Sequence, residues 1–530
     1  MTEIRTRFAP SPTGFLHIGS LRTVLFAYLF AKKNQGKFLL RVEDTDQSRE
    51  VEGATENLIQ ILEWFGLKID EGPTQGGNFG PYIQSQRLPI YKEKLKDLFA
   101  KDGCYHCFCT KERLEQVRET QIANKQAPKY DGHCRNLSKE EIQAKLDANT
   151  PYVIRQKIPK DRFVDFKDIV KGKMRFDSNT LDDQVLIKSD GFPTYHFAVA
   201  VDDNHMQISH VIRADEWLPS TPKHILLFEA FGYKVPEFVH VPPVLRPDGT
   251  KKMSKRDGNV SVEDYIKKGY TKEAIINFLS LLGWNPGTKQ ELYTQSELEE
   301  IFDLNRVQKS GAAFDIQKLD WFNWQHKRLK YLEDATDIAM QINPQVEIQE
   351  PKKGQKKFDF QNPEEFKDFN IKKGNLLENY LPVEVFTKLE NDFESKEFLY
   401  KALTSLEELI LRDPSKLEEQ ITIFTEDIEN YNKELFPHEK MKVDLELSIK
   451  VIEKCIQELK AEDFNTNLTL LAKFKEIIAE MELKNGQVLW PIRVALSNKS
   501  ESPGVFELSY ALGFEQTIKR LELCLNKISS

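Results

Sequence analysis

The sequence predicts an α/β fold: a doubly wound parallel sheet that carries an insertion and is followed by an all-α C-terminal part. Residues 4–8 alternate between apolar and polar side chains, as a half-buried strand does. A helical pattern and a second, mostly apolar strand follow by residue 43, which completes a βαβ unit. Strand and helix patterns return between residues 192 and 231, so roughly 100 residues between the two sets are expected to interrupt one sheet.

The individual elements follow from the spacing of apolar residues. Gly36 is expected to end the first helix, LRTVLFAYLFAKK. In the second set, HFAVAV and HVIRADEW have the pattern of strands, and PKHILLFEAF has that of a helix. Amphipathic helices dominate after about residue 325, in KALTSLEELILRD, LELSIKVIEKCIQELK and TLLAKFKEIIAEM. Residues 343–373, rich in Lys, Gln, Pro and Gly, are predicted to form a loop or linker.

Length and composition narrow the class of protein. At 530 residues the chain is expected to hold roughly three to five domains. It has no run of about 18 apolar residues, and its N-terminus enters a strand pattern without a signal or transit peptide, so a cytoplasmic location is expected. The net charge of −8 does not indicate nucleic-acid binding, but it does not exclude it, because phosphate binding needs only a local basic face.

The stretch FAPSPTGFLHIGS, residues 8–20, lies between the first strand and the first helix. A Gly- and Pro-rich turn at this point of a doubly wound fold binds nucleotide phosphates, because the helix N-terminus offers unpaired N–H groups and a positive dipole. The stretch has neither G-x-G-x-x-G nor a P-loop motif. His17 could donate to phosphate oxygens and Gly19 would let a flat base approach the backbone, but an H-x-G string alone equally fits an ordinary loop.

A second motif, KKMSKRDG at residues 251–258, would by itself indicate a solvated basic run or a localisation signal. Together and in this order, HIGS and KMSKR resemble the HIGH and KMSKS signatures of class I aminoacyl-tRNA synthetases. TRFAPSPTGFLHIG, RVEDTD, FPTYHFA, VIRADEW and VQKSGAAFDIQKLDW further resemble glutamyl-tRNA synthetases of the bacterial type. The resemblance runs from residue 4 to about 325 and returns at NGQVLWPIRVALSNKSESPGVFEL. Ser20 departs from the signature at its second histidine.

The resemblance implies a domain order and an activity. A Rossmann-like catalytic domain in two halves, residues 1–90 and 191–245, would surround a connective domain, residues 91–190, that binds the tRNA acceptor end. A KMSKR-loop and stem-contact domain, residues 246–330, and two helical anticodon-binding domains, residues 331–440 and 441–530, would follow. The implied enzyme is a monomer that uses ATP with Mg²⁺ to join L-glutamate to the terminal ribose of tRNA(Glu) through a glutamyl-adenylate.

The first step of this reaction constrains the catalytic residues. A glutamate carboxylate is already ionised at pH 7, so no general base is needed for its attack on the α-phosphate. The step needs alignment and positive charge at the phosphates. The resemblance implies that His17, Lys252 and Lys255 are catalytic. The implied ATP-binding residues are Pro10, His17, Gly19, Ser20, Glu216, Met253, Ser254 and Lys255.

Binding glutamate requires a partner for its side-chain carboxylate, and arginine provides bidentate, charge-assisted hydrogen bonds. Arg7 and Arg213 lie at the carboxyl ends of predicted strands, where such folds bind ligands. Each arginine alone equally fits a surface ion pair. The resemblance further places Ala9 and Ser11 beside the substrate, Glu43 against its ammonium group, and Tyr195 and Trp217 around it.

The sequence indicates in part whether the chain resembles a glutamate enzyme or a glutamine enzyme. Residues 10–14 read PSPTG, where glutaminyl-tRNA synthetases and the archaeal or eukaryotic-cytosolic glutamate enzymes tend to carry PEPNG or PEASG. The helical C-terminal third agrees, since the other branch ends in β-barrels. Whether tRNA(Gln) is charged as well, and which side chains read the anticodon, stays open.

Four of the six cysteines fall between residues 104 and 134, which in a chain without a secretion signal indicates metal rather than disulfides. Cys107, Cys109 and Cys134 resemble the C-x-C…C zinc site of some bacterial relatives, whose fourth ligand, a histidine, is replaced here by Asn136. A zinc-free remnant, packed as small apolar side chains, is the alternative. Candidates for the fourth ligand are Tyr130, which matches a tyrosine ligand in a shorter relative, His133, His106 and Cys104.

Two other functions fit parts of the sequence. A short relative glutamylates a modified base in tRNA, but it lacks the anticodon-binding helical domains, whereas this chain continues to residue 530. A non-catalytic RNA-binding or regulatory paralogue would usually lose signature residues, whereas His17, Gly19, Lys252 and Lys255 are all present. Glutamate-dependent ATP–pyrophosphate exchange separates these functions.

Overall fold

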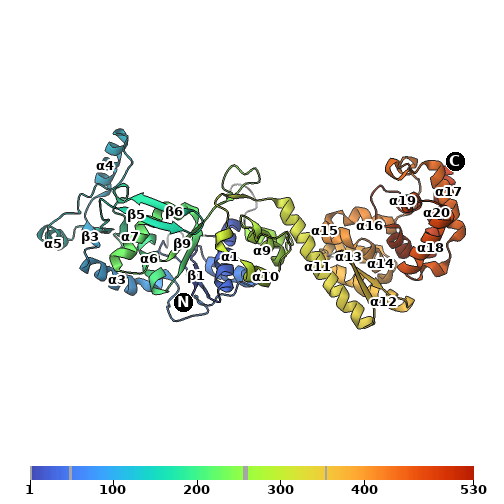
Figure 1. The fold of residues 1–530 in the computed structure, drawn as a ribbon, viewed down its shortest axis with the longest axis horizontal. Coiled ribbons are helices and arrows are strands. Elements are labelled where there is room, and N and C mark those ends of the chain that lie inside the picture. The colour runs from blue at the N-terminus through green and yellow to red at the C-terminus, as the bar shows by residue number, and fades with distance from the viewer. Residues whose placement is uncertain (1–2, 13, 47–50, 255–260, 353–354, 530) are drawn as a thin grey trace. The chain divides into compact units, whose positions relative to one another are not determined.

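The computed structural model describes residues 3–12, 14–46, 51–254, 261–352 and 355–529. The chain divides into two compact units, Met1–Asn323 and Trp324–Ser530, and each is described by itself. Figure 1 shows both, coloured along the chain. Within the described ranges, no helix combines the length and the hydropathy needed to cross a membrane.

The predicted βαβ unit is present at the start of the chain. β1 (Arg5–Phe8) and β2 (Lys37–Leu40) pair in parallel, and α1 (Ile18–Lys33) connects them. The last helical residue is Lys33, and the Gly36 N–H closes the helix by donating to the Ala31 carbonyl at 2.8 Å, as expected. Gly36 also approaches Ile4 so closely that a Cβ atom would lie 2.1 Å from the Ile4 carbonyl oxygen, which leaves room for glycine alone.

The second half of the sheet is also present, and it adjoins the first. β8 (His210–Ala214), α7 (Thr221–Phe231) and β9 (Glu237–Val241) form another parallel unit. Next to β8, the Ser209 N–H donates to the Arg5 carbonyl at 3.0 Å, which attaches the second half to β1. The carboxyl ends of β1 and β8 therefore meet at one edge, where doubly wound folds bind ligands.

The sheet is mixed rather than purely parallel. β5 (Phe163–Asp168) pairs in parallel with β9 and antiparallel with β6 (Gly172–Asp177). Both strands come from the stretch expected to form the insertion. The remainder of that stretch builds a small antiparallel sheet of β3 (Cys104–Cys107), β4 (Val153–Gln156) and β7 (Val185–Ile187), together with α3 (Leu88–Ala100), α4 (Lys111–Ala123) and α5 (Lys139–Asp147).

One of the predicted strands is a helix. HFAVAV lies in α6 (Tyr195–His205), and Phe197–Val201 are all buried. A short apolar run that is buried on every side has no amphipathic period, so its pattern does not distinguish a helix from a strand. The helix continues into Asp202 and Asp203, which it carries into the protein interior.

The other elements of the first unit fix the position of α1. They are α2 (Ala54–Trp64), α8 (Val262–Lys267), α9 (Lys272–Leu281), α10 (Gln295–Ile301) and the parallel pair β10 (Val244–Leu245) and β11 (Ala312–Ala313). One core contains Phe26 of α1, Leu279 of α9 and Leu298 of α10. The rings of Phe26 and Phe302 lie 5.1 Å apart. This packing holds α1 with its N-terminus at the carboxyl end of β1.

The second unit is mainly helical, as predicted. KALTSLEELILRD forms two helices instead of one, because the chain leaves helical geometry at Leu406, where φ is −103° and ψ is 13°. The helices are α11 (Ile316–Ile342), which begins before the unit boundary, α12 (Pro363–Leu377), α13 (Val383–Asp392), α14 (Lys396–Ser405), α15 (Glu407–Arg412), α16 (Leu417–Thr425), α17 (Leu445–Glu458), α18 (Asn467–Glu480), α19 (Asn485–Ser497) and α20 (Val505–Ser529).

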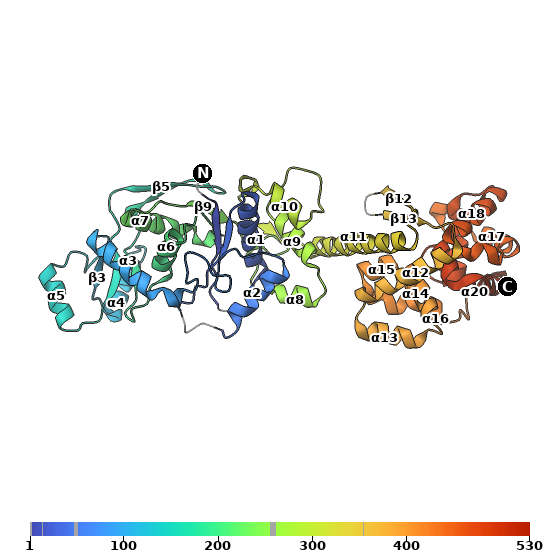
Figure 2. The ribbon, with the colours of Figure 1, turned by 90° about the horizontal axis from the view of Figure 1, so that it is seen from below.

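The prediction of a loop or linker over residues 343–373 is wrong. β12 (Glu347–Lys352) and β13 (Gln355–Asp359) form an antiparallel hairpin, labelled in Figure 2, and α12 begins soon after it. The Phe369 ring lies 4.9 Å from the rings of both Phe358 and Phe360. This aromatic cluster stabilises the hairpin, although its strands are rich in Lys and Gln.

Candidate functional site

A cleft of about 900 Å³ opens in the first unit at the carboxyl ends of β1 and β8. The hinge between β1 and α1 and the segment after β10 both line it. Lys255 lies outside the described residues. Every other residue predicted to bind ATP or glutamate lines this one cleft: Arg7, Ala9, Pro10, Ser11, His17, Gly19, Ser20, Glu43, Tyr195, Arg213, Glu216, Trp217, Lys252, Met253 and Ser254.

His17 is the N-cap residue of α1. Its backbone is extended, with φ −78° and ψ 142°, and its Nδ1 accepts a hydrogen bond from the Gly19 N–H at 3.0 Å. Because Nδ1 is an acceptor, the neutral ring carries its proton on Nε2. A Cβ atom on Gly19 would lie 3.2 Å from this Nδ1, so glycine permits the close approach. The arrangement offers an anion both an imidazole N–H and the positive end of a helix dipole.

Lys252, Met253 and Ser254 reach the cleft from the segment that follows β10. The Met253 N–H donates to the Val244 carbonyl at 2.9 Å, which attaches this segment to the core. The Lys252 ammonium group forms an ion pair with the carboxylate of Glu216. Both side chains of the pair are more than half exposed, so the pair contributes little stability and the lysine is able to exchange it for a ligand phosphate.

Arg7 belongs to a buried chain of alternating charges. Its guanidinium donates to both carboxylate oxygens of Asp203, at 3.0 and 3.3 Å. Asp203 also accepts from Arg41 at 2.8 Å, and Arg41 pairs with Glu43 at 3.0 Å. Burial raises the pKa of Glu43, and the charges of Arg41 and Arg7 offset this shift only in part. Glu43 thus lines the cleft as a carboxylate whose position is set by Arg41.

Arg213 lies at the end of β8, is 6% exposed and is surrounded by uncharged partners. Its Nε donates to His240 Nε2 at 3.1 Å, its Nη2 to Thr221 Oγ1 at 2.9 Å and its Nη1 to His224 Nδ1 at 3.3 Å. Burial lowers the pKa of Arg213, but a guanidinium stays charged at neutral pH. The rings of Tyr195 and Trp217, 4.4 Å apart, also line the cleft.

The backbone of the hinge continues the pairing of β1 with β2. The Arg41 N–H donates to the Phe8 carbonyl at 2.9 Å, and the Glu43 N–H donates to the Pro10 carbonyl at 2.8 Å. These bonds hold Ala9 and its neighbours against the segment that carries Glu43. The hinge and the Arg7 network are therefore fixed in one geometry.

Sequence reasoning missed several charged residues of this region, among them Arg22, Arg41 and Asp203. Arg22 lines the cleft from α1, where its guanidinium donates to the backbone carbonyls of Pro242 and Leu282 and burial lowers its pKa to about 10. An arginine inside the apolar run LRTVLFAYLF was a usable signal. Arg41 and Asp203 gave no such signal, because their role arises only from contacts between distant parts of the chain.

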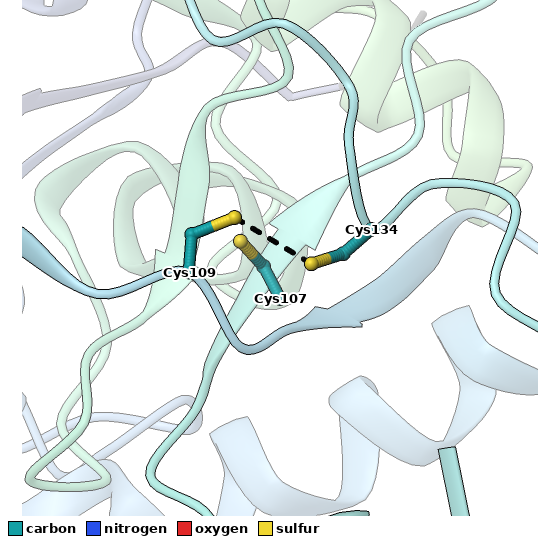
Figure 3. A group of neighbouring side chains, drawn as sticks. All are labelled: Cys107, Cys109 and Cys134. Atoms are coloured by element: carbon teal, nitrogen blue, oxygen red, sulfur yellow. Dashed lines mark hydrogen bonds between the residues drawn. The ribbon is translucent and has the colours of Figure 1, made fainter. Parts of the chain in front are cut away.

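The cysteine cluster forms a second candidate site, in the insertion. The Sγ atoms of Cys107, Cys109 and Cys134 lie within 4.8 Å of one another, with 3.5 Å between Cys109 and Cys134 (Figure 3). The Tyr130 hydroxyl lies 3.3 Å from Cys107 Sγ and 3.6 Å from Cys109 Sγ. Three thiols and one oxygen donor suit a tetrahedral zinc ion. The residues present therefore fit the metal.

The pKa values of Cys107 and Cys109 are shifted in opposite directions. Burial opposes ionisation of Cys107, but hydrogen bonds from Tyr130, the Cys109 backbone and Arg155 outweigh it and lower the pKa of Cys107. Burial raises the pKa of Cys109 to about 12. One thiol is thus prepared to ionise, whereas its neighbour needs a cation close by to become a thiolate.

The other proposed fourth ligands are not part of the cluster that the three sulfur atoms form in the described residues. His106 stacks on Phe99, with ring centroids 4.9 Å apart. The His133 backbone N–H donates to Asp131. In the described part of the chain, the potential ligand atoms that cluster here belong to Cys107, Cys109 and Cys134, and neither a histidine nor Cys104 joins them. Tyr130 is therefore the fourth donor that the geometry favours.

Comparison with known proteins agrees with this geometry. The family described as tRNA synthetases class I (E and Q), catalytic domain, matches residues 3–321, and the anticodon binding domain family matches residues 375–525. The glutamate–tRNA ligase of Clostridium novyi is 42% identical over 527 residues, which cover 99% of this chain and 98% of that protein. The glutamate–tRNA ligase of Clostridium botulinum strain Eklund 17B is 44% identical over 524 residues, or 98% of each chain.

A solved structure shares both sequence and fold with this chain. It is a glutamate tRNA ligase from Elizabethkingia meningosepticum in complex with its amino acid, 34% identical, with a TM-score of 0.73. The similarity covers 99% of this chain and 100% of the other. With these relatives, and with a catalytic-domain match over more than half its length, the chain belongs to the glutamate–tRNA ligase family of class I aminoacyl-tRNA synthetases.

Proposed function

We propose that this chain is a glutamate–tRNA ligase. It activates L-glutamate with ATP and Mg²⁺ to glutamyl-adenylate, releases pyrophosphate, and transfers the glutamyl group to the 3′-terminal ribose of tRNA(Glu). The observation that carries the proposal is the single cleft lined by His17 and Lys252, which suit phosphates, and by Arg213, which suits a carboxylate. Such a cleft is able to align a carboxylate with an α-phosphate, as activation requires.

Positive charge around the triphosphate supplies the catalysis. His17 donates through Nε2 to the phosphates in front of the α1 N-terminus, while Lys252 and Lys255 neutralise the charge that develops on the leaving pyrophosphate. Mg²⁺ arrives with ATP and binds its phosphate oxygens. The remaining contacts to ATP are made by Pro10, Gly19, Ser20, Glu216, Met253 and Ser254.

Glutamate binds beside the arginines at the carboxyl ends of the strands. Arg213 and Arg7 face its side-chain carboxylate, and Glu43 pairs with its ammonium group. Its α-carboxylate is ionised at neutral pH and attacks the α-phosphate without a general base. The substrate is further enclosed by Ala9, Ser11, Tyr195 and Trp217.

ATP–pyrophosphate exchange tests the function, with tRNA present because this family commonly needs its tRNA for activation. Exchange is expected to depend on glutamate and to be absent with glutamine. A purified chain that gives no glutamate-dependent exchange contradicts the proposal. Charging of purified tRNA(Glu) then distinguishes a ligase from the relative that modifies a tRNA base, and a parallel assay with tRNA(Gln) defines the range of tRNAs.

The tRNA is proposed to lie along the domains in the order expected from the sequence. The match to an anticodon binding domain over residues 375–525 supports anticodon binding by the helices of the second unit, through stacking and base-edge hydrogen bonds. Residues 91–190 are proposed to bind the acceptor end. The enzyme is further proposed to act in the cytoplasm as a monomer, which light scattering of the protein with and without tRNA tests.

We also propose a structural zinc site held by Cys107, Cys109, Cys134 and Tyr130. Its support is the convergence of three sulfur atoms and one hydroxyl from β3, the short segment after it and the loop after α4. Zinc at this point would fasten that loop to the strand. Metal analysis of protein purified without chelator is expected to find about one equivalent of zinc. A content below about a tenth of an equivalent contradicts the site.

A further inference from the structure

The two arginines proposed to face glutamate differ in how their charges are compensated. Arg7 forms a doubly hydrogen-bonded ion pair with Asp203, and both side chains are 4% exposed. Arg213 is equally buried, but among the described residues no carboxylate forms an ion pair with it. The cleft thus contains one buried guanidinium that is neutralised by the protein and one that is not.

The partners of Arg213 are arranged so that they accept hydrogen bonds without adding charge. A guanidinium only donates, so His240 Nε2 and His224 Nδ1 are unprotonated acceptors. His240 therefore carries its proton on Nδ1, which donates to Asp168 at 2.7 Å. His224 carries its proton on Nε2, which donates to His196 Nδ1 at 2.9 Å. Each ring is neutral and has one defined tautomer.

Asp168 fixes a tautomer and does not act as a counter-ion for Arg213. One carboxylate oxygen accepts from the backbone N–H groups of Val170 and Lys171, at 3.0 and 2.7 Å. The other accepts from the backbone N–H and the ring Nδ1–H of His240. The carboxylate is thus satisfied on the side of His240 that faces away from the guanidinium. This arrangement resembles other sites in which a buried aspartate orients a histidine.

We propose that His224, His240 and Asp168 are positioning residues for substrate selection, which hold Arg213 in place through neutral acceptors so that only a substrate carboxylate compensates its charge. This inference rests on the proposed function and explains how it distinguishes two amino acids of nearly equal size. Glutamate supplies the missing carboxylate. Glutamine supplies an uncharged carboxamide and leaves a buried guanidinium uncompensated, which costs far more than the loss of one neutral hydrogen bond.

Thr221 offers a direct test, because its Oγ1 accepts from Arg213 Nη2 and the side chain is fully buried. Thr221→Asp places a carboxylate beside the guanidinium, and Thr221→Asn, of equal size, places a neutral amide there. In glutamate-dependent ATP–pyrophosphate exchange, the KM for glutamate is expected to be at least about tenfold higher in T221D than in T221N. The KM for ATP is expected to agree between the two variants.

His240 offers a second, independent pair of variants. A glutamine at this position carries its amide near Nε2 and keeps an acceptor for Arg213, whereas an asparagine carries its amide near Nδ1 and keeps only the donor to Asp168. H240N is therefore expected to have a glutamate KM about fivefold or more above that of H240Q, with similar kcat values. Thermal unfolding of both variants checks that the fold is equally retained.

The outcomes separate this inference from the proposed function. Wild-type protein without glutamate-dependent exchange overturns the proposed function. Exchange in the wild type, combined with equal glutamate KM values in T221D and T221N, overturns the inference alone. If T221D does not fold, equal glutamate KM values in H240N and H240Q overturn the inference, and the expected difference supports it.

Discussion

His17 and Gly19 are joined by a hydrogen bond of 3.0 Å, from the Gly19 backbone N–H to His17 Nδ1. This bond satisfies a donor at the start of α1 that has no partner within the helix. It also places the remaining ring proton on Nε2, which is the atom proposed to donate to ATP. One side chain therefore has a structural role at one nitrogen and a catalytic role at the other, and substitution is able to separate them.

His17→Asn should remove the catalytic role alone. Asparagine is among the preferred N-cap residues, so α1 keeps its cap, but the Nε2–H donor is lost. We expect glutamate activation to slow by about 100-fold while the thermal unfolding midpoint stays near that of the wild type. His17→Ala should in addition lose about 1 kcal/mol of stability. Wild-type exchange by His17→Asn would contradict the role given to Nε2.

Lys252→Met should slow activation through loss of charge at the pyrophosphate. Lys252 lines the cleft, so we expect pyrophosphate exchange at saturating substrates to fall by about 100- to 1,000-fold. Glutamate binding, measured by calorimetry with tRNA present, should change little, because the lysine is proposed to contact ATP alone. The neighbouring Lys251 is exposed and does not line the cleft, so Lys251→Met is the matched control. Equal losses in both variants would remove the special role of Lys252.

The sequence predicted the parts of this site that lie in continuous motifs. The motifs predict the hinge with His17 and the segment with Lys252 as binding elements, and both line the cleft; the apolar patterns predict β1, α1, β2, β8 and α7. The pattern of α6 predicts a strand, wrongly, because its apolar run is buried on every side and has no amphipathic period. The sequence does not predict the hairpin of β12 and β13, because Lys and Gln outnumber the few aromatic residues that form its core.

The groups that set the charge of the cleft were not visible in the sequence. Asp203 is 196 residues from Arg7, and His240 is 72 residues from Asp168, so neither pair leaves a local pattern. Their roles depend on burial, because a buried ion pair or hydrogen bond affects the charge state of its partners more strongly than an exposed one does. A residue type and a motif identify a side chain that is a candidate for binding a ligand. Which groups of the protein neutralise the charge of that side chain is seen only in the folded structure.

Zinc binding should require the cysteines and depend partly on Tyr130. Cys134→Ser removes one of the three converging sulfur atoms, and we expect the zinc content to fall to well below half an equivalent. Tyr130→Phe keeps the ring that packs under Arg155 but loses the oxygen donor, so zinc should bind more weakly by about 10-fold or more. Competition with a chromogenic chelator measures both. Equal zinc affinity in Tyr130→Phe and the wild type would exclude the hydroxyl as a ligand.

Acid should destabilise the first unit through its buried histidines. Burial lowers the pKa of His196 from 6.5 to about 4. His196 therefore binds a proton near pH 6.5 in the unfolded chain but only near pH 4 in the folded chain. As the unfolded state binds more protons in this window, the free energy of unfolding falls as the pH falls, by up to about 1.4 kcal/mol per pH unit.

His196→Asn isolates this contribution. Asparagine keeps an acceptor near the position of Nδ1 for His224, but it does not titrate. Urea denaturation at pH 7 and pH 5 should therefore show a smaller loss of stability in the variant than in the wild type. The same loss in both proteins would mean that the pKa of His196 is not lowered in the folded state.

The central claim is that glutamate and ATP occupy one cleft lined by His17, Lys252 and Arg213. A glutamyl-adenylate analogue with a non-hydrolysable sulfamoyl link spans both proposed subsites, and its inhibition of pyrophosphate exchange is the measurement. A shared cleft predicts competitive inhibition against ATP and also against glutamate, with weaker inhibition after Arg213→Gln. Competition with one substrate and noncompetitive inhibition against the other would place the two substrates in separate sites and contradict the claim.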